Sequence, residues 1–232
     1  DRHCIFRVPN PSETPPELTL GLHQSGAHPP GTPAGLERLF ERLPAKDGLT
    51  MNVQNLALSG LKLIELKVHG DHRGFFVERF QMEKFRELGL PTQFLQDNHS
   101  RSAPGILRGL HYQRNPDQGK LVGVIRGRIF DVAVDLRHQS PTFGKWYGTE
   151  LSDINGKLLW IPPGFAHGFC VLGDEPADVL YKVEHLYNPQ GEGGINWNDP
   201  TVGVQWPIAS PTLSERDKSM QSFLDYSKAP KF

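Results

Sequence analysis

The sequence contains little cysteine, no long apolar run and almost no net charge, and each of these absences excludes a class of protein. The two cysteines, Cys4 and Cys170, lie far apart and belong to no paired motif, which argues against a disulfide scaffold and a structural zinc site. The formal net charge of -1 gives no field that would attract nucleic acid or an anionic membrane. We therefore predict a protein of the reducing cytoplasm with no nucleic-acid partner.

Segments for export or membrane insertion are also missing. The apolar runs are only a few residues long, whereas a membrane-spanning helix needs about 20 apolar residues. The first residues lack the basic region followed by an apolar one that marks a secretory signal. At 232 residues the chain is long enough to bury a core without disulfide or metal support. We expect a soluble protein without a membrane partner.

Residues 1–50 differ in composition from the remainder. They contain eight prolines and only two aromatic residues, so little apolar surface is available to offset the entropy lost on ordering. Apolar residues at helical spacing in the range 36–43 leave open a short amphipathic helix docked on the rest, with partial disorder as the alternative. Met51 is a candidate for the original start. We predict a proline-rich extension over 1–50 and one domain over 51–232.

Beyond residue 52 the sequence consists of short segments rich in valine, isoleucine, leucine, phenylalanine and tyrosine, separated by glycine, proline, asparagine and aspartate. Such segments, recurring about every ten residues, are typical of an antiparallel sandwich or barrel. We therefore predict an all-β antiparallel jelly roll with a few short helices, at 81–88 and 213–224. The predicted strands cover 61–68, 92–98, 106–112, 120–126, 128–136, 145–151, 158–162, 167–172 and 178–187.

The motif RGLHYQ places a titratable ring, His111, in a segment that otherwise indicates a buried strand. Because side chains alternate along a strand, His111 should share a face with Leu107 and Gly109, and Arg108 should share one with Tyr112. A glycine beside a histidine suggests that space is left for a ligand. A core histidine bonded to a backbone carbonyl is the alternative.

Three further polar residues lie in predicted strands. Lys120 begins one strand, and Asp131 interrupts the next, where an ionised carboxylate needs a partner or a wet cavity. The solvent-facing side of an edge strand is the alternative, and it would suit Asp135 equally well. Tyr181 is either a buried phenol with one hydrogen bond or a proton donor in a cavity.

The segment IPPGFAHGF has Pro162, Gly164 and His167 in the spacing PxGxxH, which is half of the metal signature of cupin barrels. A divalent transition metal needs three or four converging ligands. The motif GLHYQRN, however, has Tyr112 and Gln113 where the second histidine of the other half should stand. The ligand set is incomplete, so we predict a cavity that works without metal.

Cations, carboxylates and amides also lie in loops and at strand ends of the motifs GDHRGFFVERF and FLQDNHSRS. This mixture suits a phosphate and a nucleobase edge better than a fatty substrate. Polar groups that only stabilise turns are the alternative. The residues concerned are Arg73, Glu78, Gln96, Asn98 and Arg108.

Taken in order, these segments resemble the dTDP-4-dehydrorhamnose 3,5-epimerase family of nucleotide-sugar epimerases. The resemblance runs from about Met51 to Asp217, through GDHRGFFVERF, FLQDNHS, GILRGLHYQ, QGKLV, IFDVAVDLRHQSPTFGKW, LWIPPGFAHGF, YKVEHLY and INWNDP. It implies a cupin-type jelly roll that acts as a homodimer without metal or cofactor. It also implies a dTDP-linked 4-keto-6-deoxyhexose as substrate, on the route to dTDP-L-rhamnose.

The resemblance assigns roles to individual residues. It makes His111 the general base, Asp217 its carboxylate partner and Tyr181 the acid on the opposite face of the sugar. Lys120, with Asp131 nearby, would stabilise the oxygen at C4. The positions implied to hold the nucleotide or the sugar are Arg73, Glu78, Gln96, Asp97, Asn98, Arg108, Lys120, His167, Tyr187, Glu192 and Arg216.

These residue types suit the implied chemistry, which removes a proton beside a ketone and returns one from the other face. An imidazole with a pKa near ~6.5 is a competent base at neutral pH, and a phenol with a pKa near ~10 still carries a proton to return. Two residues depart from the family pattern: Arg216 replaces a common lysine, and His69 replaces a frequent aromatic ring. A single-site epimerase and a non-catalytic sugar-nucleotide binder are the alternatives.

Overall fold

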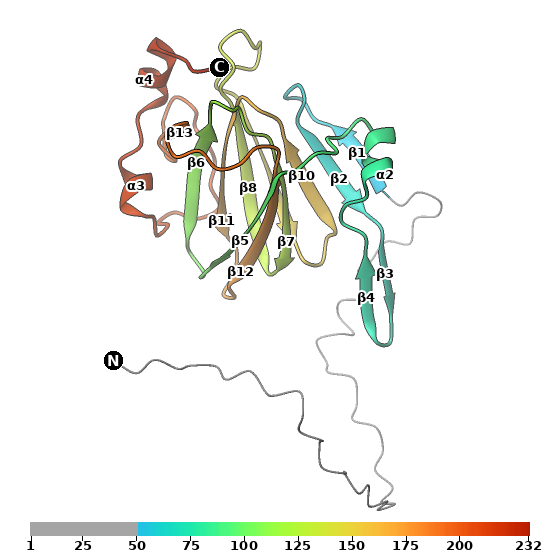
Figure 1. The fold of residues 1–232 in the computed structure, drawn as a ribbon. Coiled ribbons are helices and arrows are strands. Elements are labelled where there is room, and N and C mark those ends of the chain that lie inside the picture. Colours follow the sequence, from blue (N-terminus) through green and yellow to red (C-terminus); the bar gives the residue numbers. More distant parts are fainter. Residues whose placement is uncertain (1–50) are drawn as a thin grey trace, which may run out of the picture. The chain divides into compact units, whose positions relative to one another are not determined.

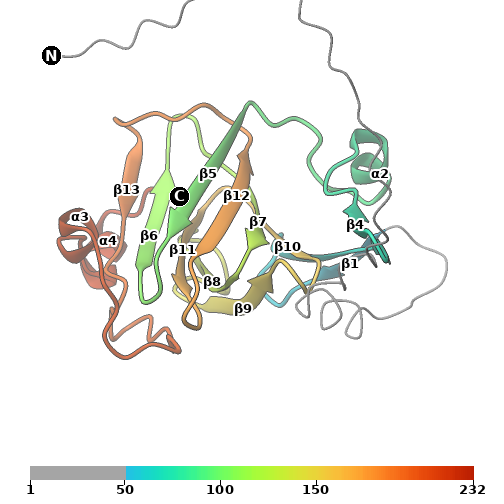
Figure 2. The ribbon, with the colours of Figure 1, turned by 90° about the horizontal axis from the view of Figure 1, so that it is seen from below.

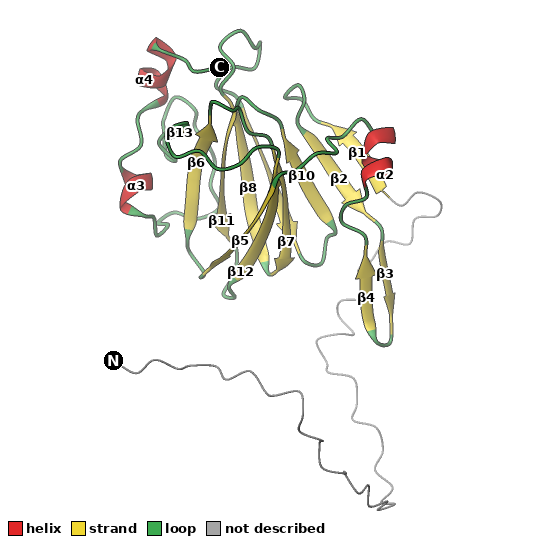
Figure 3. Cartoon of the chain, in the orientation of Figure 1, coloured by secondary structure: helices red, strands yellow, loops and turns green. Residues whose placement is uncertain are grey.

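The structure is a computed structural model that describes residues 51–232. The predictions for residues 1–50 therefore lie outside the described part of the chain. Antiparallel strands dominate the described residues, and the helices are short (Figures 1 and 3). None of the described helices is long and apolar enough to cross a membrane.

Two antiparallel sheets face each other. Figure 2 shows β5, β12 and β7 of one sheet on one side, and β6, β11 and β8 of the other sheet opposite them. The six-stranded sheet has the order β1 (Met51–Asn55), β2 (Lys62–Leu66), β10 (Lys157–Ile161), β7 (Lys120–Arg126), β12 (Ala177–Val183) and β5 (Gln96–Ser102). The five-stranded sheet has the order β13 (Glu192–Gly194), β6 (Leu107–Gln113), β11 (Phe165–Val171), β8 (Arg128–Asp135) and β9 (Trp146–Ser152). The predicted jelly roll is confirmed.

The core lies between these sheets because alternate side chains of each strand point inward. Val122 of β7 and Val179 of β12 are fully buried and pack in one cluster with Ile129 of β8 and Phe169 of β11. Burying one such side chain contributes about 1.5–3 kcal/mol. The same alternation places polar residues of β5, β6, β7 and β12 toward the space between the sheets.

Smaller elements flank the two sheets. The hairpin of β3 (Val68–Asp71) and β4 (Gly74–Val77) extends away from them in Figure 1, and helix α2 (Met82–Glu87) follows it. Helices α3 (Glu215–Lys218) and α4 (Phe223–Lys228) lie in the C-terminal segment.

Several predicted boundaries are wrong. The helix expected over 213–224 is two helices, because Ser214 and Ser222 each cap a new start and Gln221 forms a bridge with Ile195 between them. The strand expected over 178–187 ends at Val183. Beyond it, the backbone carbonyls of His185 and Leu186 accept hydrogen bonds from the side-chain amides of Gln118 and Gln113 instead of from a neighbouring strand.

Two further predicted strands also differ from the structure. The strand expected over 92–98 begins only at Gln96, because Phe94 packs against aromatic rings instead. The strand expected over 61–68 is divided between β2 and β3. The short strands β1, β4 and β13 were not predicted.

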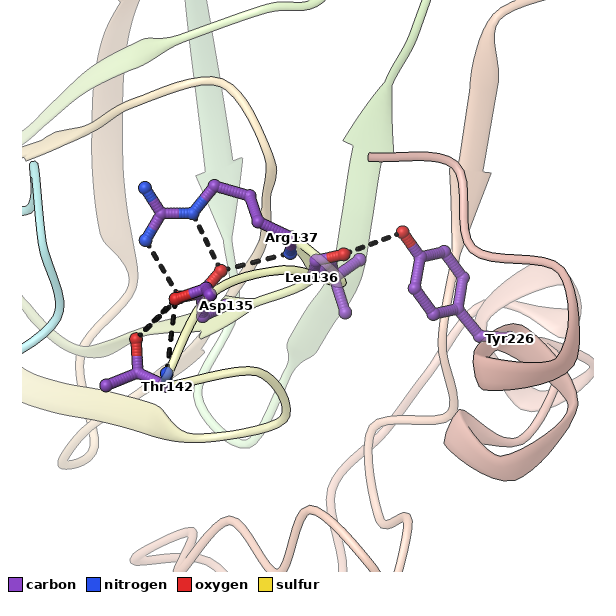
Figure 4. A network of polar contacts seen from close by, with 6 residues as sticks. Asp135, Leu136, Arg137, Thr142 and Tyr226 are labelled. Atoms are coloured by element: carbon purple, nitrogen blue, oxygen red, sulfur yellow. Dashed lines mark hydrogen bonds and ion pairs between the residues drawn. The ribbon is translucent and has the colours of Figure 1, made fainter.

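The loop after β8 is fixed by a buried carboxylate (Figure 4). Asp135 is fully buried and accepts hydrogen bonds from Arg137, Ser140 and Thr142. Burial alone would raise the pKa of Asp135, but these donors lower it overall. The hydroxyl of Tyr226 in α4 donates to the backbone carbonyl of Leu136 at 3.0 Å. The solvent-facing alternative for Asp135 is therefore wrong, and its loop anchors the C-terminal segment.

Candidate active site

A cavity of about 500 Å³ opens between the two sheets. Polar side chains of both sheets and of α3 line it: Arg108, His111, Lys120, His167, Tyr181, Arg216 and Asp217. A neighbouring lobe of about 260 Å³ shares His111, Lys120 and Tyr181 and adds Gln96, Asn98, Tyr187 and Glu192. The cavity therefore gathers most of the residues that the sequence singled out.

The candidate base and the candidate acid come from different sheets. His111 belongs to β6 of the five-stranded sheet, whereas Lys120 in β7 and Tyr181 in β12 belong to the six-stranded sheet. All three line both lobes of the cavity. A molecule bound between the sheets would thus meet the imidazole on one side and the phenol on the other.

His111 is bonded to a carboxylate from a distant part of the chain. Its Nε2 lies 2.7 Å from Oδ1 of Asp217, which is 106 residues away in sequence. An ionised carboxylate can only accept, so Nε2 donates and Nδ1 is the basic nitrogen of the neutral ring. The reading of His111 as a core histidine bonded to a backbone carbonyl is therefore wrong.

The side chain of Asp217 is buried. Its backbone N–H donates to the capping hydroxyl of Ser214 at 3.1 Å, and its Oδ2 accepts a long hydrogen bond from the N–H of Gly109. Burial would raise the pKa of Asp217, but the hydrogen bond and charge of His111 lower it overall. The carboxylate is thus ionised beside the imidazole at neutral pH.

The parity prediction for β6 is partly wrong, because the strand contains a bulge. His111 pairs with His167 while Arg108 pairs with Phe169, so three steps on β6 match two on β11. The extra residue turns Arg108 into the same cavity as His111. Tyr112 instead packs in the cluster on the other side of the sheet.

Gly109 has a different role from the predicted one. A Cβ there would lie 2.5 Å from Cα of Gly168, and its φ of +123° is one that L side chains rarely adopt. The space beside Gly109 is filled by the backbone of β11 and not by a ligand. The glycine is required for the close approach of the two strands.

Lys120 supplies a cation at the centre of the site. Its Nζ donates to the backbone carbonyl of His111 at 3.3 Å. Burial lowers the pKa of Lys120 to about 8, against the opposing effect of the carboxylates of Glu192 and Asp131. The side chain is therefore mostly an ammonium at pH 7 and titrates near the physiological range.

Tyr181 remains protonated across the same range. Burial raises the pKa of Tyr181 above its ordinary value; the Arg108 guanidinium opposes this, and Glu192 adds to it. Tyr181 lines both lobes of the cavity from β12. This observation favours the proton-donor reading over that of a buried structural phenol.

Comparison with known proteins gives the same result as the motifs. A model of the family "dTDP-4-dehydrorhamnose 3,5-epimerase" matches residues 55–225. The chain belongs to this family. The dTDP-4-dehydrorhamnose 3,5-epimerase of Shigella flexneri is 51% identical over 177 residues, which are 75% of this chain and 97% of that protein. The predicted family is confirmed.

Solved structures of the epimerase family share the fold. A dTDP-6-deoxy-D-glucose-3,5-epimerase from Legionella pneumophila Philadelphia 1, in complex with dTDP-4-keto-L-rhamnose, matches with a TM-score of 0.72 and 48% identity. The match covers 75% of this chain and 93% of that one.

A relative that is named for one carbon is also similar in sequence. The dTDP-4-dehydrorhamnose 3-epimerase of Streptomyces niveus is 38% identical over 170 residues, which are 72% of this chain and 82% of that protein.

Three residues that the epimerase resemblance assigns to the ligand lie outside the cavity. Arg73, at the tip of the β3–β4 hairpin, is exposed and pairs with Asp71. Glu78 follows the hairpin and pairs with Lys84 at 2.6 Å. Asp97 lies between Gln96 and Asn98 on β5, so strand alternation turns it outward, where it pairs with Lys182.

His167 and Asp131 form a second histidine–carboxylate pair in the epimerase cavity wall. Nε2 of His167 donates to Oδ1 of Asp131 at 2.8 Å, and His167 lines the cavity. Asp131 is fully buried, so its solvent-facing alternative is wrong. Its other oxygen, Oδ2, has no hydrogen-bond partner within residues 51–232. Among these residues, no three His, Cys, Asp or Glu side chains are grouped to hold a metal.

Some residues that line or support the cavity were not predicted from the sequence. The side chain of Gln113 donates to the carbonyl of Leu186 and accepts from the N–H of Asn188 at 2.9 Å, which fixes the loop that carries Tyr187. Ser100, which lines the cavity, also lies outside the predicted set. Strand alternation from Asn98 could have indicated Ser100, but nothing local indicates the contacts of Gln113.

Proposed function

We propose that this chain catalyses the 3,5-epimerisation of a dTDP-linked 4-dehydro-6-deoxyglucose, without metal or cofactor, on the route to dTDP-L-rhamnose. One observation carries the proposal. An imidazole backed by a carboxylate and a protonated phenol face one cavity from opposite sheets. Inversion at carbon requires a base and an acid on opposite sides of the reacting atom.

Each inversion begins with proton removal from a carbon next to the C4 ketone. Nδ1 of His111 takes the proton, and the electron pair of the broken C–H bond becomes that of an enolate. Asp217 stabilises the imidazolium that forms, and the ammonium of Lys120 stabilises the charge on the oxygen at C4. Preorganised charge of this kind is worth about 10² to 10³ in rate.

Tyr181 returns a proton to the same carbon from the opposite face. The enolate electron pair forms the new C–H bond, and the ketone is restored with inverted configuration. The phenolate and the imidazolium then exchange protons with solvent before the second carbon reacts. C3 and C5 are both adjacent to C4, so one set of groups serves both carbons.

Nucleotide binding is assigned to the mouth of the cavity. Gln96, Asn98 and Tyr187 offer amides and a ring for a base, and Arg108 and Arg216 offer guanidinium groups for a diphosphate. The replacement of a common lysine by Arg216 preserves the positive charge. We propose that this cytoplasmic enzyme releases its product to a reductase that consumes the 4-keto group.

A homodimer would account for the residues that lie outside the cavity. Arg73 and Glu78 belong to the hairpin segment, whose Phe75 and Phe76 are exposed. Exposed aromatic rings on a protruding hairpin are typical of a surface that another chain covers. Pairing of two chains would bring these residues to a ligand in the partner. Sedimentation analysis should therefore show a dimer, and Phe76→Glu should weaken it.

The similarity to a 3-epimerase supports a second candidate, inversion at C3 alone. The stronger similarity, 51% against 38% identity, is to an enzyme named for both carbons. Proton NMR of the reaction in deuterated water separates the two. Deuterium at C3 and C5 is expected, and retention of the C5 proton would leave only the single-site activity.

The main test is a coupled assay with the 4-keto sugar nucleotide and an NADPH-dependent reductase. His111→Ala should lose about 10² to 10⁴ in kcat, because proton transfer by a placed base contributes that much. Tyr181→Phe should lose a comparable factor. Both variants should keep dTDP affinity within about tenfold of wild type, since other residues contact the nucleotide. Wild-type protein that binds dTDP but consumes no NADPH would instead be a non-catalytic binder.

A further inference from the structure

Glu192 of β13 lines the smaller lobe of the cavity and contacts both α3 and the loop that carries Tyr187. Its Oε1 lies 2.7 Å from Nη2 of Arg216 in α3, and its Oε2 accepts a hydrogen bond from the hydroxyl of Tyr187 at 2.6 Å. Both carboxylate oxygens are therefore engaged by groups that the family resemblance assigns to the ligand. Burial would raise the pKa of Glu192, but Arg216 and Tyr187 lower it overall. The carboxylate is therefore ionised at neutral pH.

Arg216 directly precedes Asp217, the partner of His111. The turn that carries both residues is held at each end by backbone hydrogen bonds. On one side, Thr212 exchanges hydrogen bonds with Gly105 and Leu107 at 2.8 and 3.0 Å. On the other side, the carbonyl of Gln221 accepts from the N–H of Asn196 at 2.8 Å.

Between these anchors, the turn has few links to the rest of the described structure. Within residues 214–219, Asp217 bonds to His111 and Gly109, and Arg216 bonds to Glu192. The other hydrogen bonds of Ser214, Lys218 and Ser219 stay inside the turn. Apart from the bonds of Asp217 itself, the ion pair of Arg216 with Glu192, beside the hydroxyl of Tyr187, is thus what holds the middle of this turn.

The link closes a ring that returns to His111. In the sheet, Gly194 of β13 pairs with His111 of β6, and Glu192 pairs with Gln113 two residues farther along. The register of β13 on β6 therefore sets the position of Glu192 relative to His111. From Glu192 the ring continues through Arg216 and Asp217 back to the imidazole.

We infer that Glu192 is a positioning residue for the general base, which holds Asp217 against His111 through its ion pair with Arg216. The inference deepens the proposed function and rests on it. A contact made only to the ligand would affect binding. A positioning residue instead affects the chemical step, since a misplacement of about 1 Å costs up to about 10²-fold in rate.

The experiment is a double-mutant cycle with Glu192→Gln and Arg216→Gln, measured as kcat in the coupled assay and as Kd for dTDP by calorimetry. Glu192→Gln should lower kcat by about 10- to 100-fold and change Kd for dTDP by less than about threefold. The double variant should lose no more kcat than the worse single variant, because both break the same link. Arg216→Lys should recover most of the kcat that Arg216→Gln loses.

Glu215→Gln is the matched control. Glu215 is on the same helix and forms an ion pair with Lys218, but its side chain is exposed. This variant should keep wild-type kcat and Kd. A Glu192→Gln variant with unchanged kcat and weaker dTDP binding would overturn the inference, and so would losses that multiply in the double variant.

A readout without turnover separates this inference from the proposed function. In ¹⁵N-histidine NMR of the ligand-free protein, the signal of His111, assigned by its absence in His111→Asn, should report the tautomer protonated at Nε2. Glu192→Gln should shift this signal toward a tautomer mixture, whereas Glu215→Gln should not. An unchanged signal in Glu192→Gln would overturn the inference, whether or not wild type turns over.

Discussion

The cavity contains two histidine–carboxylate pairs that look alike but are built differently. In the pair of His111 and Asp217, the imidazole is 24% exposed and the carboxylate 5%. In the pair of His167 and Asp131, the corresponding values are 8% and 0%. The first pair joins a strand to a one-turn helix 106 residues away, whereas the second joins the neighbouring strands β11 and β8.

This difference separates a pair suited to proton transfer from one suited to fixed electrostatics. The carboxylate of Asp217 also accepts a hydrogen bond from the N–H of Gly109, and His111 lines the cavity. Asp131 has one unpaired buried oxygen and influences the proton affinity of Lys120. A buried carboxylate without full hydrogen bonding is costly, so its charge is better explained by an effect on the cation than by packing.

The largest expected difference between the pairs is in turnover. Asp217→Asn should lower kcat by about 10² to 10⁴, because the amide no longer fixes the tautomer or stabilises the imidazolium. The coupled assay at saturating substrate measures this loss. Asp225→Asn, which alters an exposed ion pair on α4, is the control and should leave kcat unchanged. A loss below tenfold for Asp217→Asn would mean that the first pair is no better suited to proton transfer than the second.

The close approach of β6 and β11 at Gly109 and Gly168, beside the two histidines, is the next target. Gly109→Ala should destabilise the fold by about 2–5 kcal/mol, because a Cβ would meet the backbone of Gly168 at a φ of +123°. Urea denaturation measures the change. Gly74→Ala separates the two causes, since Gly74 has a φ of +135° with open space around it. Equal losses for both variants would mean that backbone strain alone matters and the close approach does not.

The electrostatic role of the second pair should appear in the pH dependence. Because burial lowers the pKa of Lys120 to about 8, kcat/KM should fall as the pH rises through this value and the ammonium is lost. Lys120→Arg should remove this limb, since a guanidinium stays charged. The measurement is kcat/KM from pH 6 to 10, a range chosen around the ordinary lysine value.

The same profile distinguishes Asp131 from Asp217. The carboxylate of Asp131 favours the charged form of Lys120, so Asp131→Asn should lower the pKa of Lys120 and move the alkaline limb to lower pH. At pH 7 its loss of turnover should be smaller than that of Asp217→Asn. An alkaline limb that stays in place would show that Asp131 serves only to orient His167.

The regular strands could be predicted from the sequence because their apolar residues recur with the correct period. The segments 120–126 and 128–136 match β7 and β8 almost residue for residue. The period carries no information on β13 or the β3–β4 hairpin, since these short strands are polar or exposed. Serine caps that begin new helices inside a helical pattern also escaped prediction.

The site was predictable to a smaller extent from the residues alone. Strand alternation assumes that each residue of β6 pairs with one residue of its neighbour. The bulge that places Arg108 beside His111 breaks this assumption and could not be predicted. The contact of His111 with Asp217 follows from the folding of the C-terminal segment over the sheet, which no local pattern encodes. Here the family resemblance supplied what the periodicity could not.

Because His111 and Tyr181 come from opposite sheets, the packing of the core between the sheets sets the distance between the base and the acid. The separation of base and acid follows the spacing of two packed sheets, which is about 10 Å in proteins generally. Residues such as Val122 and Val179 fill that spacing without touching the cavity. Replacing them with larger or smaller side chains would change the distance between the two proton-transfer groups. Core variants that lower thermal stability should therefore also lower turnover.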